Sequence, residues 1–170
     1  MAQTIRQFIL GGDAGALQTL YRMRGIVNRS LADPLVIETA RNIVENAGVL
    51  GRDQWGKYLA LRQWIEEHLQ FLPDPLGVEL LSTPRYMLQR IRQASFVSGD
   101  CDDGAILGAA LGKVVGLAAK FRALSFVNQH RPFQHVYTLL LVNGRWMNLD
   151  TTRSPRTVPP DPARVLELGV

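Results

Sequence analysis

The stretch SGDCDDGAILGAALGKVVGLAA, residues 98–119, holds the side chains best suited to chemistry in this chain. It contains the only cysteine, Cys101, which stands among Asp100, Asp102 and Asp103 just ahead of an apolar run. The thiolate is the nucleophilic form of cysteine, and a helix N-terminus or a cationic neighbour favours it. The pattern predicts a thiol available for nucleophilic attack if a helix begins at Cys101.

Helix capping accounts for the three aspartates. With Asp100 as the N-cap, Cys101 is the first helical residue, and Asp102 and Asp103 follow where carboxylates accept free backbone N–H groups and complement the helix dipole. The following residues are apolar on nearly every face, as in a helix at the centre of a domain. Its first turn must reach an edge, because unpaired carboxylates are costly to bury. The helix end favours the thiolate and the carboxylates oppose it, so a cationic partner such as histidine is needed.

Three histidines are candidates for this partner. His68, in WIEEHLQF, is expected at the surface or at a helix end, and His130, in NQHRPF, is expected in an exposed loop. His135 begins the run HVYTLLLV, on the strand face that we expect to line the core or a cleft, together with Phe133, Tyr137, Leu139 and Leu141. A lone histidine on such a face is more often a hydrogen-bonded core residue than a catalyst. A catalytic role for His135 therefore depends on which residues the next strand places beside it.

Asp150 ends that next strand, in GRWMNLD. The dipeptide Asn143-Gly144 predicts a tight hairpin turn that pairs residue 142 with residue 145. In this register Tyr137 faces Asp150, and His135 lies diagonally beyond, at a backbone separation of roughly 7–8 Å that side chains can bridge. A carboxylate could then orient the imidazole and the imidazole could face the thiol, as in a Cys-His-Asp triad.

Helices are expected before the cysteine. Apolar residues recur at helical spacing from about Asp13 to Asn28, in the segment that begins with Asp33-Pro34, and in the segment capped by Asp53. A short helix is expected from Pro84. The segment 71–86 contains three prolines and is predicted to be a loop.

After the cysteine helix the apolar period changes to two, which predicts strands at 121–127, 134–142 and 145–150. The tail, residues 153–170, holds four of the nine prolines and is expected to be extended along the surface and to end in a short helix. Helices followed by an antiparallel sheet predict an α+β fold, with the cysteine helix packed on that sheet. We expect residues 1–170 to form a single domain with its core motif at 98–152.

Composition limits the function classes. The chain has 170 residues, 46% of them hydrophobic and 20% charged, and a net charge of +4 carried mainly by arginines that form no basic run. A solvated basic surface is therefore a better interpretation than nucleic-acid binding. One cysteine excludes an intrachain disulfide and a multi-cysteine zinc site. We expect no membrane contact and no signal peptide, and a cytoplasmic or virion-associated location.

The segments GDCDDGAILGAAL and HVYTLLLVNGRWMNLDTT resemble the transglutaminase-like superfamily of papain-type thiol enzymes. The family pattern is a cysteine at a helix start, a histidine that begins the next strand, and an aspartate at the end of the following one. The resemblance implies a papain-like fold with Cys101 as nucleophile, His135 as base and Asp150 as orienting residue. The stretch DPLGVELLSTPRYML also resembles phage- and prophage-encoded members.

The family chemistry is thiolate attack on an amide, formation of an acyl-enzyme, and transfer to water or an amine. We expect no cofactor and no metal, and no acidic cluster indicates the calcium-regulated type. The backbone N–H of Cys101 could stabilise the oxyanion, with Gln70, Gln93 and Trp55 as conceivable second donors.

Two hypotheses remain for the function. The first is a thiol acyl-transfer enzyme that acts on a protein or peptide, and the presence of Cys101, His135 and Asp150 favours it. A peptidase or amidase is preferred over an amine-crosslinking transglutaminase. The second is a catalytically idle binding or assembly module, such as a phage-particle component, whose proline-rich tail contacts the partner.

Overall fold

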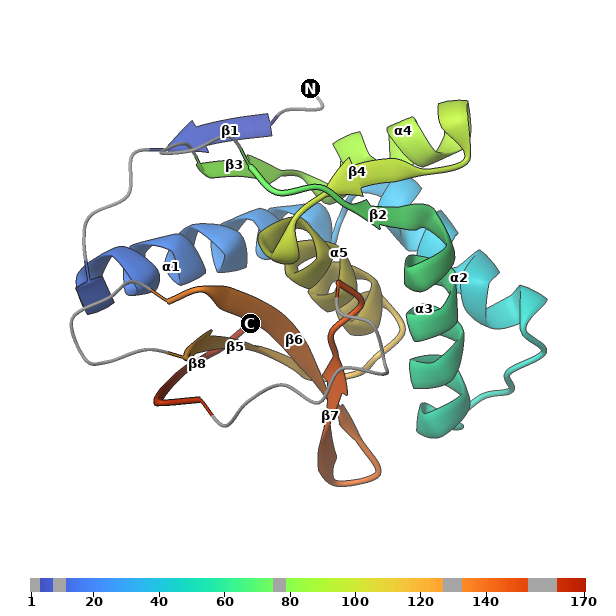
Figure 1. The fold of residues 1–170 in the computed structure, drawn as a ribbon. Coiled ribbons are helices and arrows are strands. Elements are labelled where there is room, and N and C mark those ends of the chain that lie inside the picture. Colours follow the sequence, from blue (N-terminus) through green and yellow to red (C-terminus); the bar gives the residue numbers. More distant parts are fainter. Residues whose placement is uncertain (1–3, 8–11, 75–78, 127–132, 153–161) are drawn as a thin grey trace.

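The computed structural model describes residues 4–7, 12–74, 79–126, 133–152 and 162–170. Within this part, five helices are interspersed among short strands (Figure 1). The helices are α1 (Gly12–Ser30), α2 (Pro34–Asn46), α3 (Gln54–His68), α4 (Pro84–Ala94) and α5 (Cys101–Val114). The strands are β1 (Thr4–Gln7), β2 (Leu69–Phe71), β3 (Glu79–Ser82), β4 (Val97–Gly99), β5 (Ala119–Ser125), β6 (His135–Val142), β7 (Arg145–Leu149) and β8 (Arg164–Gly169).

Helix α5 is the centre of the molecule. It contacts α1, α2 and α3 as well as β6, and Figure 1 shows it between the helices and the larger sheet. Two glycines let α5 approach the sheet closely, because a methyl group at Gly108 would lie 2.7 Å from Leu149 Cδ2 and one at Gly112 would lie 2.6 Å from Leu140 Cδ2. Residues 102–112 of α5 are all buried, which confirms the prediction of a central helix.

The helix starts follow the capping residues in the sequence. Asp33, Asp53 and Thr83 cap α2, α3 and α4 through their side chains, and Pro34 and Pro84 stand in the first turns of α2 and α4. No helix in the described ranges is both long enough and apolar enough to cross a membrane.

The larger sheet has the strand order β7-β6-β5-β8. Strands β6 and β7 form the predicted hairpin, with Val142 opposite Arg145 and Thr138 opposite Leu149. The turn residues Asn143 and Gly144 have φ of 50° and 79°, as a two-residue turn with positive φ at both positions requires.

The end of the chain differs from the prediction. Residues 164–169 form strand β8 antiparallel to β5, so the prediction of a short terminal helix is wrong. Leu166 and Leu168 pack against the core, while Glu167 pairs with Lys120 and Arg122 of β5. Pairing with the edge of β5 outweighs the helix propensity of leucine and glutamate. Tail residues 153–161 lie outside the described residues.

Two small strand pairs complete the fold. Strand β1 pairs antiparallel with β3, and β2 pairs parallel with β4. The prediction of a loop over 71–86 is therefore wrong at Phe71 and at Glu79–Ser82. These strands have three or four residues each, too few for an alternating pattern to be visible in the sequence. Figure 1 shows both pairs beside the beginning of α5.

Candidate active site

Cys101 is the first residue of α5, as its surroundings in the sequence predict. The Asp100 side chain caps the helix by accepting hydrogen bonds from the backbone N–H groups of Asp102 (3.0 Å) and Asp103 (3.4 Å). The half-buried thiol donates to Asp102 Oδ1 over 3.7 Å. The nucleophile candidate is thus fixed at the N-terminal end of a buried helix, where the partial positive charge of the helix favours an anion.

Asp103 joins the first turn of α5 to strand β3. Its Oδ1 accepts a hydrogen bond from the backbone N–H of Ser82 over 2.8 Å, and both residues are buried. Burial raises the pKa of Asp103 to about 7, the charge of Asp100 acts in the same direction, and the hydrogen bonds from Ser82 oppose the change. The buried hydrogen bond from Ser82 to Asp103 thus fixes the helix start relative to β3.

His135 and Asp150 form a close buried pair. His135 Nε2 lies 2.6 Å from Asp150 Oδ2, and the two side chains are 7% and 10% exposed. Asp150 Oδ1 also accepts from the Thr152 hydroxyl (2.9 Å) and backbone N–H (3.2 Å). Burial alone would raise the pKa of Asp150, but the hydrogen bonds from His135 and Thr152 outweigh it and hold the pKa below its usual value. Asp150 is thus suited to remain an anion beside the imidazole.

The segment after Asp150 lies against the first turn of the cysteine helix. A methyl group added at Gly104, one turn after Cys101, would be 3.3 Å from Thr152 Cγ2 and 3.0 Å from Leu69 Cδ2. On β6, the Thr138 hydroxyl donates to the carbonyl oxygen of Ala105 over 2.7 Å. The structure therefore brings the strand ends that carry His135 and Asp150 to the end of α5 that carries Cys101.

The face of His135 is not the face that packs on α5. Val136 and Leu140 join the main core, whereas Tyr137 and Leu139 form a smaller cluster with Leu124 on the opposite face of β6. The His135 ring lies 5.8 Å from the Tyr137 ring. The expectation of a buried histidine is confirmed, but the larger core lies behind the other face of the strand.

His68 makes its contacts within its own helix. His68 ends α3 and stacks on Trp64 with ring centroids 4.4 Å apart, in agreement with a helix-end position. His130 lies outside the described residues.

Of the conceivable oxyanion donors, Gln70 is nearest along the fold, since it pairs with Ser98 in β2–β4. However, Leu69 faces α5, so Gln70 points to the opposite side of the strand. Trp55 stands at the far end of α3 from β2, and a helix of 15 residues spans about 22 Å. Gln93 is exposed in the last turn of α4.

The first-turn acids could also be considered as metal ligands. One ligand atom from each of Asp100, Cys101 and Asp102 lies within 4.8 Å of the others. Both carboxylates already accept hydrogen bonds at this helix start, from backbone N–H groups and from the thiol. Capping therefore accounts for the cluster.

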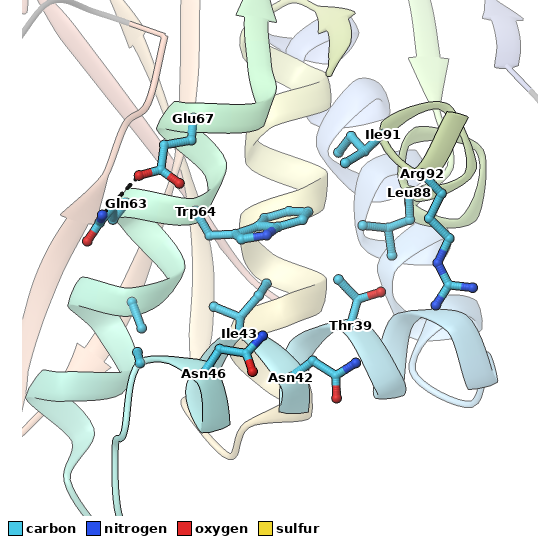
Figure 2. A pocket seen from close by; sticks show the side chains of 12 residues that line it. Thr39, Asn42, Ile43, Asn46, Gln63, Trp64, Glu67, Leu88, Ile91 and Arg92 are labelled. Carbon is cyan, nitrogen blue, oxygen red and sulfur yellow. Dashed lines mark hydrogen bonds between the residues drawn. The ribbon is translucent and has the colours of Figure 1, made fainter. Parts of the chain in front are cut away.

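A separate pocket of about 470 Å³ lies between α2, α3 and α4 (Figure 2). Figure 2 shows Trp64 across its centre, with Ile43 and Leu88 nearby and the polar side chains of Asn42, Asn46 and Gln63 at the edge. The residues that line it include none of Cys101, His135 and Asp150, so the pocket does not belong to this site.

Sequence reasoning missed three contributors to the site. Thr152 braces Asp150, and the order Asp-x-Thr is itself a signal, because a hydroxyl and N–H two residues on commonly bond to an aspartate. Gly104 begins a series of glycines spaced four residues apart, which places them on one helix face. The bond from Ser82 to Asp103 has no signal in the sequence, because it depends on the position of β3.

The chain matches no protein-family model, and no curated protein is significantly similar to it in sequence. Among solved structures, it resembles the "putative protease" from Parabacteroides distasonis ATCC 8503, with a TM-score of 0.56 and 15% identity over 76% of this chain and 25% of that one. It also aligns with the "putative cysteine protease" from Cytophaga hutchinsonii, with a TM-score of 0.48 and 21% identity over 69% and 38% of the two chains. The chain thus spans about a quarter and less than two fifths of their lengths. The first likeness confirms the α+β fold.

Proposed function

We propose that this chain is a thiol-dependent acyl-transfer enzyme that hydrolyses amide bonds in a protein or peptide. Cys101 is the nucleophile, His135 the general base and acid, and Asp150 the orienting residue. The observation that carries the proposal is the buried contact of 2.6 Å between His135 Nε2 and Asp150 Oδ2. Thr152, which bonds to Asp150, lies against Gly104, one turn after the only thiol.

In the first step the imidazole takes the thiol proton on Nδ1, the ring nitrogen that Asp150 leaves unoccupied. The sulfur attacks the amide carbonyl carbon, and the negative charge moves to the carbonyl oxygen. The backbone N–H of Cys101 supports this oxyanion, because the first N–H groups of a helix have no partner inside it. The C–N bond then breaks, and the amine leaves with the proton from the imidazolium.

In the second step the imidazole removes a proton from water, and the oxygen attacks the thioester. The C–S bond breaks, the acid product leaves, and the sulfur regains its proton from the imidazolium. Asp150 keeps Nε2 protonated throughout, so that Nδ1 always faces the reaction. Thr152 supports this role, because its two hydrogen bonds hold the carboxylate in place.

Hydrolysis is preferred to crosslinking because water is always available as an acceptor. The α+β fold shared with a protein described as a protease also suits this choice.

The proposal is tested with fluorescently labelled casein and a mixture of fluorogenic peptide amides. We expect peptide release by the wild type, none by Cys101→Ala, and a loss of about 10²-fold or more for Asp150→Asn. Circular dichroism should show that both variants are folded. Equal cleavage by Cys101→Ala would contradict the proposal. Incorporation of an added labelled amine in place of hydrolysis would show that the acyl acceptor is an amine and not water.

A further inference from the structure

Two large apolar side chains are exposed at the end of strand β2. Phe71 is 56% exposed and Leu72 is 59% exposed, although the preceding residue of the same face, Leu69, is buried. An exposed phenylalanine beside an exposed leucine is unfavourable in water, so such a pair is a candidate for contact with another molecule.

This pair lies close to Cys101 through the parallel strands. Phe71 pairs with Gly99, and the backbone N–H of Leu72 donates to the Gly99 carbonyl oxygen over 2.9 Å. Gly99 precedes Cys101 by two residues. With strands about 4.8 Å apart and a rise of about 3.3 Å per residue, the backbones of Phe71 and Cys101 are roughly 8–11 Å apart.

The Phe71 ring lies on the side of β2 that faces the cysteine helix. Leu69 Cδ2 lies over Gly104, where an added methyl group would come within 3.0 Å of it. Residues two apart on a strand share a face, so Phe71 projects to this side as well, one step nearer to the strand end. Strand β4 leads directly into the start of α5, and β2 runs parallel to β4. The step from Leu69 to Phe71 along β2 therefore leads toward Cys101, which is one turn before Gly104. Phe71 is therefore level with Cys101.

The backbone of Phe71 has an open edge. The N–H of Leu72 points toward β4, and hydrogen-bonding directions alternate along a strand, so the N–H and C=O of Phe71 point away from β4. Within the described ranges, no strand pairs with β2 on that side. A strand edge of this kind can accept an extended peptide by main-chain hydrogen bonds.

We propose that Phe71 forms the substrate subsite that selects an extended polypeptide with a large apolar side chain next to the scissile amide. The substrate backbone pairs with the free edge of β2, and its apolar side chain packs on the Phe71 ring. The inference rests on the proposed function of Cys101 and adds the substrate class. The open edge and the exposed ring lie side by side at the level of the thiol, which is why a substrate rather than a distant partner is the occupant.

The test uses dipeptidyl vinyl sulfones that differ only in the side chains of their two residues, each being Phe, Leu, Gly, Asp or Lys. The Cys101 sulfur adds to the vinyl carbon and the neighbouring carbon takes up a proton, so intact mass gives the rate of modification. We expect the wild type to react at least about tenfold faster with Phe or Leu than with Gly, Asp or Lys at one of the two positions.

Variants assign this preference to the proposed residues. Phe71→Ser should abolish the preference and Phe71→Leu should keep it, while the rate with iodoacetamide, which has no side chain, stays the same in both. Phe96→Ser is the matched control, because Phe96 is also an exposed ring (40%) near Cys101 but shares the opposite face with Ser98. It should leave the preference unchanged.

The outcomes separate this inference from the function on which it rests. If Cys101 reacts with iodoacetamide and every vinyl sulfone at a similar rate, or if Phe71→Ser keeps the preference, the subsite is overturned and the thiol chemistry stands. If Cys101 reacts with none of these reagents, the proposed function fails first. If the wild type is a dimer, Phe71→Ser is a monomer and the two show the same selectivity, the surface binds a second copy and the subsite is overturned.

Discussion

Replacement of Asp103 by asparagine should remove a large part of the pH dependence of folding stability. Asp103 is buried in the first turn of α5 and accepts a hydrogen bond from the backbone N–H of Ser82. Asparagine has nearly the same shape and can still accept that bond through its carbonyl oxygen, but it carries no charge. The substitution therefore tests the buried charge separately from the packing.

The sign and size follow from the pKa of Asp103, which burial raises from 3.8 to about 7 in the folded protein. Its contribution to stability is fully present below pH 3.8 and is lost as the pH rises to and through 7, because the unfolded chain releases the proton first. The difference between the two values, at roughly 1.4 kcal/mol per pH unit, amounts to about 4 kcal/mol. The lowered pKa of Asp150 has the opposite effect and costs stability as the pH falls, but it is common to both proteins.

The assay is urea unfolding of wild type and Asp103→Asn, followed by tryptophan fluorescence between pH 4 and pH 8.5. The unfolding free energy of Asp103→Asn minus that of the wild type should therefore increase by about 4 kcal/mol between pH 4 and pH 8.5. Glu45→Gln, which removes an exposed carboxylate from α2, is the control and should parallel the wild type. Parallel curves for wild type and Asp103→Asn, or a difference that shrinks as the pH rises, would show that the pKa of Asp103 is not raised in the folded protein.

Two further predictions concern the contacts around the site. Gly108→Ala should lower the free energy of unfolding by about 1–3 kcal/mol, because the added methyl group would lie 2.7 Å from Leu149 Cδ2. Gly169→Ala, with open space around it, should change the free energy of unfolding by less than about 0.5 kcal/mol. Equal effects of the two substitutions in urea unfolding would argue against the close approach of α5 to the sheet. Ending the chain after Thr152 removes β8 and should cost about 2 kcal/mol or more through lost burial of Leu166 and Leu168, so an unchanged melting temperature would show that β8 adds nothing.

The sequence predicts the cysteine helix and the hairpin because their signals are local. Asp100 is a capping residue, the run after Asp103 is apolar on nearly every face, and Asn143-Gly144 sets the register that places Asp150 near His135. From these features alone, the pairing of His135 with Asp150 can be expected. The contact of 2.6 Å agrees with that expectation.

The remaining features depend on contacts between distant segments. Residues 164–169 form a strand only because the edge of β5 is free to pair with them, while their own propensities favour a helix. Strands β2 and β4 have three residues each, so no periodicity could reveal that Phe71 is paired with Gly99. The hydrogen bond from Ser82 to Asp103 likewise joins residues 21 positions apart in the sequence.

The pH dependence of the reaction of Cys101 with iodoacetamide shows whether His135 and Asp150 activate the thiol. The measured quantity is the second-order rate constant from pH 4 to pH 10, in the wild type and in Asp150→Asn, with intact mass confirming modification at the only thiol. We expect a midpoint clearly below the value of about 8.5 for a free thiol in the wild type, and a rate at pH 7 at least about tenfold lower in Asp150→Asn. A midpoint at or above 8.5 that is the same in both proteins would show that Cys101 is not an activated nucleophile.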